Sequence, residues 1–580
     1  MKTKTRRGFF QPKVLATAVA LGCATQAQAV SFNIGDIEGQ FDSSLSVGAS
    51  WGLKDADSKY VGKNNGGTAS STTSDDGRLN FKKGETFSKI FKGIHDLQLK
   101  YGDTGIFVRG KYWYDFELKD EHRELYDISD SGRSMGARSS GAELLDAFIY
   151  HNYNIGDLPG TVRLGKQVVS WGESTFIQNS INSINPIDVA AFRRPGSEVK
   201  EGLIPVSMLY LSQGITDSLT VEGFYQLKWE KTVVDNCGTF FSTTDVAANG
   251  CNRMVYAGTD FDPNPADGYR YMARSSDKTP SDGGQWGMAL RWYAAELNDT
   301  EFGAYVMNYH SRNPIYGVIT GNGTANATTG ANSAQYFIEY PEDIRLYGLS
   351  FQTNIGSTSV AGEISYRPNM PLQLNSTDLS IAAIYPIASL GNPIYSSGYA
   401  TAQPGETIDG YVRKPFTQAQ VTLTQFFDQV FGADRLTLVG EVGIDHISGI
   451  NDSQLRFGRD SIYGFGGKGA TCPTLNAANP DECNNDGFYT TTSWGYRVRG
   501  ILDYPNVFAG VNLKPNVAWQ HDVNGYGPNF SKKAKAISLG VDADYQNTYT
   551  ASLSYTNYFG GEYNPVNDRD FIALSVGVNF

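Results

Sequence analysis

The chain has few of the features that mark soluble enzymes or nucleic-acid-binding proteins. Only six histidines and five cysteines occur in 580 residues. The sequence contains no H-E-x-x-H motif and no G-x-x-x-x-G-K-[ST] phosphate loop. Basic residues are not in excess, because 60 acidic residues outnumber 48 basic ones. We therefore expect no enzymatic activity, no cofactor, no metal and no nucleic-acid partner.

Long apolar segments are also absent beyond residue 29, where no run approaches the roughly 20 residues that a membrane helix requires. A soluble chain of this length is expected to split into several domains, yet no linker or change of composition marks a boundary. Aromatic residues reach 13%, with 34 tyrosines, and glycine is abundant at 64 residues. One large β-barrel explains this composition, because half of each strand faces water and tyrosines gather at the membrane interfaces.

The N-terminus has the pattern of a secretory signal peptide. Five basic residues begin the chain: Lys2, Lys4, Arg6, Arg7 and Lys13. An apolar run from Val14 to Gly22 follows, and Ala27-Gln28-Ala29 offers the small residues that a signal peptidase requires. We predict cleavage after Ala29 in preference to a twin-arginine signal or acylation of Cys23. Residues 30–580 then form the barrel, with 43 basic and 60 acidic residues and a charge of −17.

The C-terminus has the pattern of the last strand of an outer-membrane barrel. Every second residue from Ile572 to Phe580 is apolar, and the chain ends on that phenylalanine. A strand with lipid on one side and a lumen on the other must alternate in this way. The terminal aromatic residue resembles the signal that the barrel-assembly machinery of Gram-negative bacteria reads, so Phe580 is the predicted assembly signal.

Alternating segments predict a transmembrane antiparallel β-barrel of about 18 strands, with long extracellular loops and short periplasmic turns. The predicted strands are 41–54, 92–102, 105–117, 142–155, 160–171, 204–213, 217–230, 285–297, 300–311, 344–355, 358–367, 415–428, 435–446, 493–504, 509–523, 534–546, 548–559 and 569–580. Both termini lie in the periplasm in this scheme. Sixteen strands would result if one hairpin were a folded-in loop.

Charged and polar side chains segregate to the inward face of these strands. The predicted lumen-lining residues of the wall are Arg109, Lys111, Asp115, Arg163, Gln167, Glu222, Arg497 and Arg499. Their mixed signs indicate a wet lumen without a ring of one charge. The alternative is that such charges pair to fill a closed barrel. Lys166 is less regular, since it would face lipid unless a bulge or an interfacial position accommodates it.

The predicted third outer loop, 172–203, is the candidate gate. Asn185-Pro186 is typical of a helix start, Ile187 to Arg194 fits two turns, and Pro195-Gly196 would end them. If the loop folds inward, its residues and the preceding tryptophan would form a constriction or plug; they are Trp171, Glu173, Asp188, Arg193, Arg194 and Glu198. The alternative is an ordinary surface lid.

Four cysteines remain after the predicted cleavage, as two close pairs in polar loops. Closing a short loop costs the least chain entropy, and the exported compartment is oxidising. We therefore predict the disulfides Cys237–Cys251 and Cys472–Cys483. Zinc-finger spacing and nearby histidines are absent from both pairs, which disfavours metal binding.

Several motifs together resemble a proteobacterial outer-membrane family known as domain of unknown function 1302 (DUF1302). They include Gly48-Ala49-Ser50-Trp51, Asp75-Asp76-Gly77-Arg78-Leu79-Asn80-Phe81, Arg163 to Ser174, Asn185-Pro186-Ile187-Asp188, Arg194-Pro195-Gly196-Ser197-Glu198 and Asp568-Arg569-Asp570-Phe571. Lys166 replaces the arginine that is usual before the family's glutamine. The resemblance implies transport of lipophilic or amphipathic compounds, together with a periplasmic partner and an inner-membrane exporter of the resistance-nodulation-division type.

These observations favour an outer-membrane channel for small, amphipathic or hydrophobic molecules. The alternative is a barrel that serves as the outer-membrane part of an envelope transport complex. A third hypothesis, an outer-membrane hydrolase, would need a serine or aspartate within reach of a histidine. The expected surroundings are outer-membrane lipid and lipopolysaccharide, reached through the barrel-assembly machinery.

Overall fold

The computed structural model describes residues 30–580, except for 126–127, 452–453, 468–471 and 478. The predicted signal peptide lies outside the described residues. Among the residues within these limits, no helix is both long enough and apolar enough to cross a membrane.

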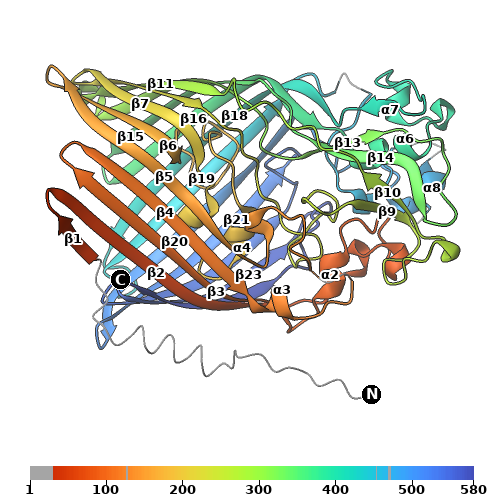
Figure 1. Ribbon diagram of the computed structural model, residues 1–580, viewed down its shortest axis with the longest axis horizontal. Helices are drawn as coiled ribbons and strands as arrows, with labels where there is room; N and C mark the ends of the chain where they lie inside the picture. Colours follow the sequence, from red (N-terminus) through yellow and green to blue (C-terminus); the bar gives the residue numbers. More distant parts are fainter. Residues whose placement is uncertain (1–29, 126–127, 452–453, 468–471, 478) are drawn as a thin grey trace.

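Eighteen antiparallel strands form one closed barrel (Figure 1). They are β2 (Ile37–Gly52), β3 (Thr86–Tyr101), β4 (Thr104–Asp115), β5 (Ser140–Ile155), β6 (Leu158–Gln167), β7 (Val206–Thr216), β8 (Leu219–Gln226), β11 (Trp286–Ala294), β12 (Thr300–Tyr309), β15 (Ile344–Ile355), β16 (Thr358–Gln373), β18 (Tyr411–Asp428), β19 (Arg435–Ile447), β20 (Thr492–Phe508), β21 (Val511–Asn524), β22 (Lys535–Tyr545), β23 (Tyr549–Phe559) and β24 (Phe571–Asn579). Pairing of β2 with β24 closes the barrel, and β1 (Val30–Ile34) pairs with the start of β2.

The predicted strand number is confirmed, and each of the eighteen predicted segments overlaps one strand of the wall. Long outer connections alternate with short turns, as expected. The largest differences lie at strand ends. The strand predicted to end at 367 continues to Gln373, because a register shift between Arg367 and Met370 lets the ladder with β18 resume beyond Pro368. Proline interrupts a ladder but is accommodated at such a bulge.

Side chains along the wall strands alternate between an exposed, apolar outer face and a more buried inner face. In β15, Tyr347 and Leu349 are 47% and 60% exposed, whereas Ile344 and Leu346 are 2% and 0% exposed. A period of two residues places exposed and buried side chains on opposite faces of the strand. The exposed apolar face is the surface that a barrel presents to lipid.

A second, five-stranded sheet lies beyond one end of the barrel, opposite the C-terminus (Figure 1). Its strands are β17 (Thr407–Ile408), β13 (Ile315–Ile319), β14 (Ala331–Glu339), β10 (Arg270–Arg274) and β9 (Arg253–Ala257). These segments lie in regions predicted to be loops. They form strands because they pair with one another, within a connection for β9–β10 and β13–β14 and between connections for β10–β14, which is parallel, and β13–β17.

The helices are short, and all belong to the outer connections. They are α2 (Asp76–Asn80), α3 (Phe116–Asp120), α4 (Val189–Arg193), α5 (Val199–Gly202), α6 (Ser376–Ile384), α7 (Pro393–Ser396) and α8 (Cys472–Leu475). Both predicted disulfides, Cys237–Cys251 and Cys472–Cys483, are confirmed. Each crosslinks residues of a single outer connection.

Candidate functional site: an inward-folded loop and the polar wall beside it

The connection between β6 and β7, residues 168–205, folds into the barrel and is called the inward loop below. Its first part contacts inward side chains of β16, β18 and β19, and its second part contacts β2, β3, β4 and β24. Because these two sets of strands belong to different parts of the wall, the loop spans the lumen.

Two wall glutamates bind the backbone of the first part of the loop. Glu441 on β19 accepts hydrogen bonds from the N–H groups of Thr175, Phe176 and Ile177, at 3.0, 2.6 and 2.8 Å. Glu363 on β16 accepts from the N–H groups of Glu173, Ser174 and Ile181. Both carboxylates are buried, at 2% and 5% exposure. Hydrogen bonds to a charged acceptor are stronger than neutral ones, so these residues fix the path of residues 173–181.

Two lysines hold the second part of the loop. Lys111 on β4 places its Nζ 3.1 Å from Oδ2 of Asp188, and Lys92 on β3 places its Nζ 2.7 Å from Oε1 of Glu201. Backbone carbonyls of the loop also accept from them, Glu201 O from Lys111 at 2.9 Å and Gly196 O from Lys92 at 2.7 Å. The wall therefore binds one part of the loop with carboxylates and the other with ammonium groups.

The local sequence explains the shape of the second part. The Asp188 carboxylate accepts from the Ala191 N–H at 3.0 Å and caps α4. The helix is shorter than the predicted two turns, and α5, capped by Glu198 and Glu201, begins after the Pro195-Gly196 turn. Pro195 lies directly over Gly48 of β2, where a Cβ atom would come within 2.8 Å of its ring. Glycine at position 48 thus permits close contact between loop and wall.

An apolar cluster closes the lumen beside β7, β8, β12 and β15. The loop contributes Trp171, Ile181 and Ile184, and the wall contributes residues that include Met208, Phe224, Tyr305 and Leu346. The indole Nε1 of Trp171 donates to Glu222 at 2.7 Å. Trp171, Met208 and Leu346 are at most 1% exposed. Apolar side chains of the loop and the wall therefore pack together on this side of the lumen.

The wall from β21 through β24 to β2 is different, since its inward side chains are small, polar and mostly part-exposed. They are Asn512, Asn516, Gln520, Ser538, Thr550, Ser552, Ser554, Thr556, Ser575, Asn579, Ser44 and Ser46. A cavity of about 570 Å³ lies between this wall and residues 196–198 and 201 of the inward loop. Asp542, Asp544 and Lys514 also line it. This strip of wall is the part of the lumen that remains accessible to water.

Most predicted wall residues have partners. Arg109 pairs with Asp96 and Asp146, Arg497 with Asp522 and Glu222 with Arg291. Asp115 accepts from Ser88, Arg163 lies over the Tyr210 ring, and Gln167 donates to the Met208 carbonyl. Arg499 on β20 is the exception, with no hydrogen bond or ion pair to any residue that the structure describes.

Two arginines of the loop contact the wall and other outer connections. Arg194 stacks over the Trp113 ring at 4.2 Å and donates to the Gly136 carbonyl at 2.7 Å. Arg193 pairs with Asp235 at 3.3 Å and lies over Phe241. Both therefore attach the loop to the wall and to outer connections, because the aromatic rings and the carboxylate lie on that side.

Glu173 is the loop carboxylate with an unusual proton affinity. Burial raises its pKa to about 7, while Arg291 opposes this shift and Glu301 and Glu363 add to it. Glu363 and Glu441 were recognisable in the sequence as inward wall charges. Their role in holding the loop could not be recognised there, because it depends on backbone N–H groups more than 180 residues away.

The chain resembles solved outer-membrane proteins at low identity. With OccAB1 of Acinetobacter baumannii the identity is 10%, the match covers 96% of this chain and 98% of that one, and the TM-score is 0.41. With the outer membrane channel DcaP of Acinetobacter baumannii the identity is 10%, the match covers 95% of this chain and 100% of that one, and the TM-score is 0.35. With Pseudomonas aeruginosa OpdK with vanillate the identity is 9%, the match covers 93% of this chain and 98% of that one, and the TM-score is 0.37.

Curated proteins give no match to the chain. A model of the family described as "Protein of unknown function (DUF1302)" matches residues 11–580. That range includes all the strands of the barrel and the inward loop, and the chain therefore belongs to this family.

Proposed function

We propose that this protein is an outer-membrane channel for small amphipathic molecules, with a path between the inward loop and the wall from β21 through β24 to β2. The observation that carries the proposal is the 570 Å³ cavity, which has the loop on one side and small polar wall residues on the other. Hydroxyl and amide groups can replace part of the water shell of a permeating solute without binding it tightly.

A second cavity supports the amphipathic character of the solute. It has a volume of about 600 Å³ and lies among the outer connections. Its apolar lining includes Tyr256, Tyr316, Ile338, Ile381, Tyr385 and Phe465. Ligand sites commonly combine such apolar surfaces with a few polar groups. The apolar part of a solute would bind here before its polar part enters the lumen.

Single-channel conductance of the purified protein tests the proposal. Deletion of residues 180–200 removes most of the second part of the loop, with its anchored residues Asp188 and Gly196, and leaves every wall strand intact, so conductance should rise severalfold. A matched control deletes residues 264–268, a tip of an outer connection that contributes to neither cavity. If the wild type and both deletions conduct equally, the loop does not limit permeation. If none of them conducts, the channel proposal is wrong.

Permeation of two related solutes tests the amphipathic preference. Proteoliposomes should admit phenyl glucoside faster than methyl glucoside through the wild-type protein. Tyr316→Ala should reduce that difference without changing the conductance of small ions, because Tyr316 lines only the outer cavity. Equal rates for the two glucosides would leave a channel without this preference.

The other two hypotheses have less support. His95 Nδ1 lies 2.8 Å from Ser43 Oγ, but within the described part of the chain no carboxylate is hydrogen-bonded to His95, and Ser43 is only 4% exposed. A hydrolase needs an accessible, oriented nucleophile. The periplasmic partner and the exporter implied by the family resemblance stay predictions.

A further inference from the structure

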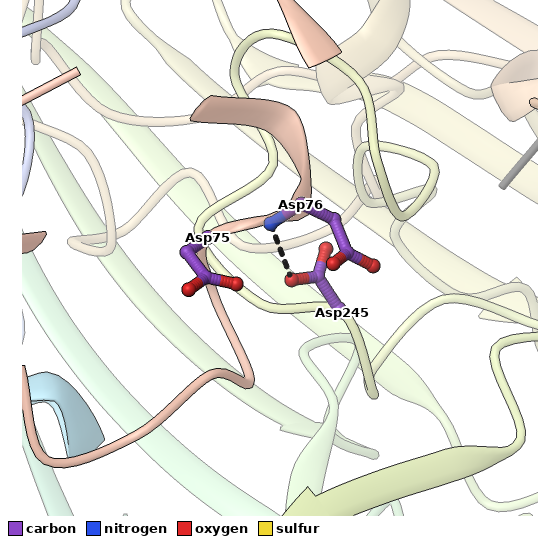
Figure 2. Close-up of side chains that lie close together, drawn as sticks. All are labelled: Asp75, Asp76 and Asp245. Atoms are coloured by element: carbon purple, nitrogen blue, oxygen red, sulfur yellow. Dashed lines mark hydrogen bonds between the residues drawn. The ribbon is translucent and has the colours of Figure 1, made fainter. Parts of the chain in front are cut away.

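Three aspartates from two outer connections lie close together, away from the strands of the barrel wall. Asp75 and Asp76 stand at the start of α2, and Asp245 belongs to the connection between β8 and β11. One carboxylate oxygen from each lies within 4.8 Å of the other two. Figure 2 shows the Asp245 carboxylate drawn between those of Asp75 and Asp76. Asp75 and Asp76 are buried, at 0% and 5% exposure.

Asp76 differs from its two neighbours in its hydrogen bonds. The Asp75 carboxylate accepts from the Gly62 N–H at 2.7 Å and from Asn65 Nδ2 at 3.2 Å. The Asp245 carboxylate accepts from the N–H groups of Gly238 and Asp76, at 3.2 and 3.4 Å. In the described part of the chain, the Asp76 carboxylate accepts no hydrogen bond, and its Oδ1 is fully buried.

A carboxylate in this position requires a partner. Burying a charged group without hydrogen bonds or an opposite charge is strongly unfavourable. The orphaned Asp76 side chain is directed into the same cluster as Asp75 and Asp245. The position therefore calls for a cation or a proton at the place where the three carboxylates converge.

The nearby arginines do not supply that charge. Arg78 Nε and Arg569 Nε lie 3.0 and 3.8 Å from the carboxylate of Asp568, so both pair with a fourth aspartate. With all groups ionised, these four aspartates exceed the two arginines by two negative charges, and the buried Asp260, which shares the Asn65 amide with Asp75, adds a third.

We propose that Asp75, Asp76 and Asp245 bind one divalent cation of the calcium class, which links the first outer connection to the fourth. Calcium prefers carboxylate and carbonyl oxygens, and this cluster offers oxygen ligands. A divalent charge offsets most of the excess negative charge and gives the Asp76 oxygens a partner. Sites of this kind in extracellular modules have dissociation constants of about 10⁻⁴ to 10⁻³ M.

The site would also influence the outer cavity. Residues 70–73 and 244–247 lie on the same two connections as the three aspartates, and members of both segments line the 600 Å³ cavity. Asn80 of α2 donates to the carbonyl oxygens of Leu125 and Gly238, so α2 contacts the fourth connection directly. A cation that holds α2 against Asp245 would thus stabilise one side of the cavity.

The test uses the folded full chain in detergent, first treated with a chelator and then titrated with CaCl₂ by calorimetry. One calcium ion should bind per chain and raise the unfolding temperature of the outer connections. Asp76→Asn should weaken binding by about tenfold or more, since loss of even a supporting residue typically weakens metal binding about 10- to 100-fold. Asp245→Asn should weaken it similarly, which guards against a folding defect in one variant.

The control is Asp262→Asn, which removes an exposed carboxylate from the same connection as Asp245 and should bind calcium like the wild type. With the chelator present, Asp76→Asn should unfold at the same or a higher temperature than the wild type, because it relieves repulsion between carboxylates. A wild type that binds no calcium, or that is stabilised only by lowering the pH, would show that protons occupy the cluster and would overturn the proposal. Neither readout depends on conductance.

Discussion

Lys111 and Asp188 form an ion pair across the boundary between the wall and the inward loop, with Nζ and Oδ2 3.1 Å apart. The two side chains are only 2% and 1% exposed. Asp188 also caps α4 through the Ala191 N–H, and Lys111 also donates to the Glu201 carbonyl. This pair thus joins strand β4 to both short helices of the loop.

Replacing Lys111 with methionine should release the second part of the loop. Removing one member of a buried ion pair leaves the other charge uncompensated, at a cost of about 3–5 kcal/mol. Limited proteolysis should then cut within residues 186–203, while heat-modifiable barrel still forms. The control is Lys119→Met, which breaks an ion pair with Asp130. Because the Lys119 side chain is 38% exposed, this change should lower the free energy of unfolding by at most about 1 kcal/mol. Equal resistance of both variants to protease would contradict this assignment.

Glu441→Ala should free the first part of the loop. Three consecutive N–H groups, those of Thr175, Phe176 and Ile177, lose their acceptor. Each buried donor left unsatisfied costs about 1–3 kcal/mol. We expect larger and noisier single-channel currents. The control is Thr437→Ala. Thr437 is an inward residue of the same strand and makes no hydrogen bond to the loop, so this change should leave the currents unaltered.

Arg499→Gln should shift ion preference toward cations. A unit positive charge about 6 Å away in water disfavours a passing cation by about 0.7 kcal/mol and favours an anion by as much, so it changes the cation-to-anion ratio about tenfold. Reversal potentials under a salt gradient measure this ratio. Arg435→Gln is the matched control. Arg435, at the start of β19, is already paired with Asp428, so its charge is largely compensated. An unchanged ratio in Arg499→Gln would place this side chain away from the ion path.

The ion preference should also depend on pH through Glu173. Its pKa is raised from 4.5 to about 7, chiefly by burial. The loop therefore gains one negative charge as the pH rises from 6 to 8, and cation preference should increase over that range. The folded state holds the proton more tightly than the unfolded state, so the contribution of this group to stability falls as the pH rises through 7. Glu173→Gln should abolish the change in preference; if it persists, another group titrates.

Phe580 should be required for efficient assembly of the barrel. Its backbone N–H and carbonyl both bond to Ser43, at 2.8 and 2.6 Å, beside the seam between β2 and β24. Deleting Phe580 removes these two bonds, each contributing about 0.5–1.5 kcal/mol, whereas Phe580→Ser retains them. If both variants lower the amount of folded protein in outer membranes equally, the aromatic ring is the assembly signal. If only the deletion does so, the seam bonds are what matter.

The wall could be predicted from the sequence because lipid and lumen impose a period of two residues on every strand. Lys166 shows how far this pattern reaches. Its outward position was recognised, and the structure shows that the ladders on both sides pass through it without a register shift. The ammonium group instead donates to the Leu144 carbonyl at 2.7 Å. A register shift of β5 against β4 lies at this carbonyl, between Leu144 and Ala147, so a bulge in the neighbouring strand accommodates Lys166.

The outer sheet and the anchors of the loop could not be predicted in the same way. Strands β9 and β13 pair only with segments of the outer connections, so their partners depend on the folded arrangement of those connections. Similarly, the sequence placed Arg194 in the loop but could not show that Trp113 would stack beneath it. Alternation determines which face of the wall a residue occupies, and it contains no information about contacts across the lumen.

In the proposed outer-membrane channel, the outer sheet is the surface that the cell would present to its surroundings. Three connections contribute to it: β9 and β10 belong to the connection between β8 and β11, β13 and β14 to that between β12 and β15, and β17 to that between β16 and β18. No single connection contains a complete set of strand partners. Antibodies raised against the folded protein should therefore recognise discontinuous epitopes, and peptides copied from one connection should compete poorly for them. An immunogen built on this surface would need all three connections held on a barrel.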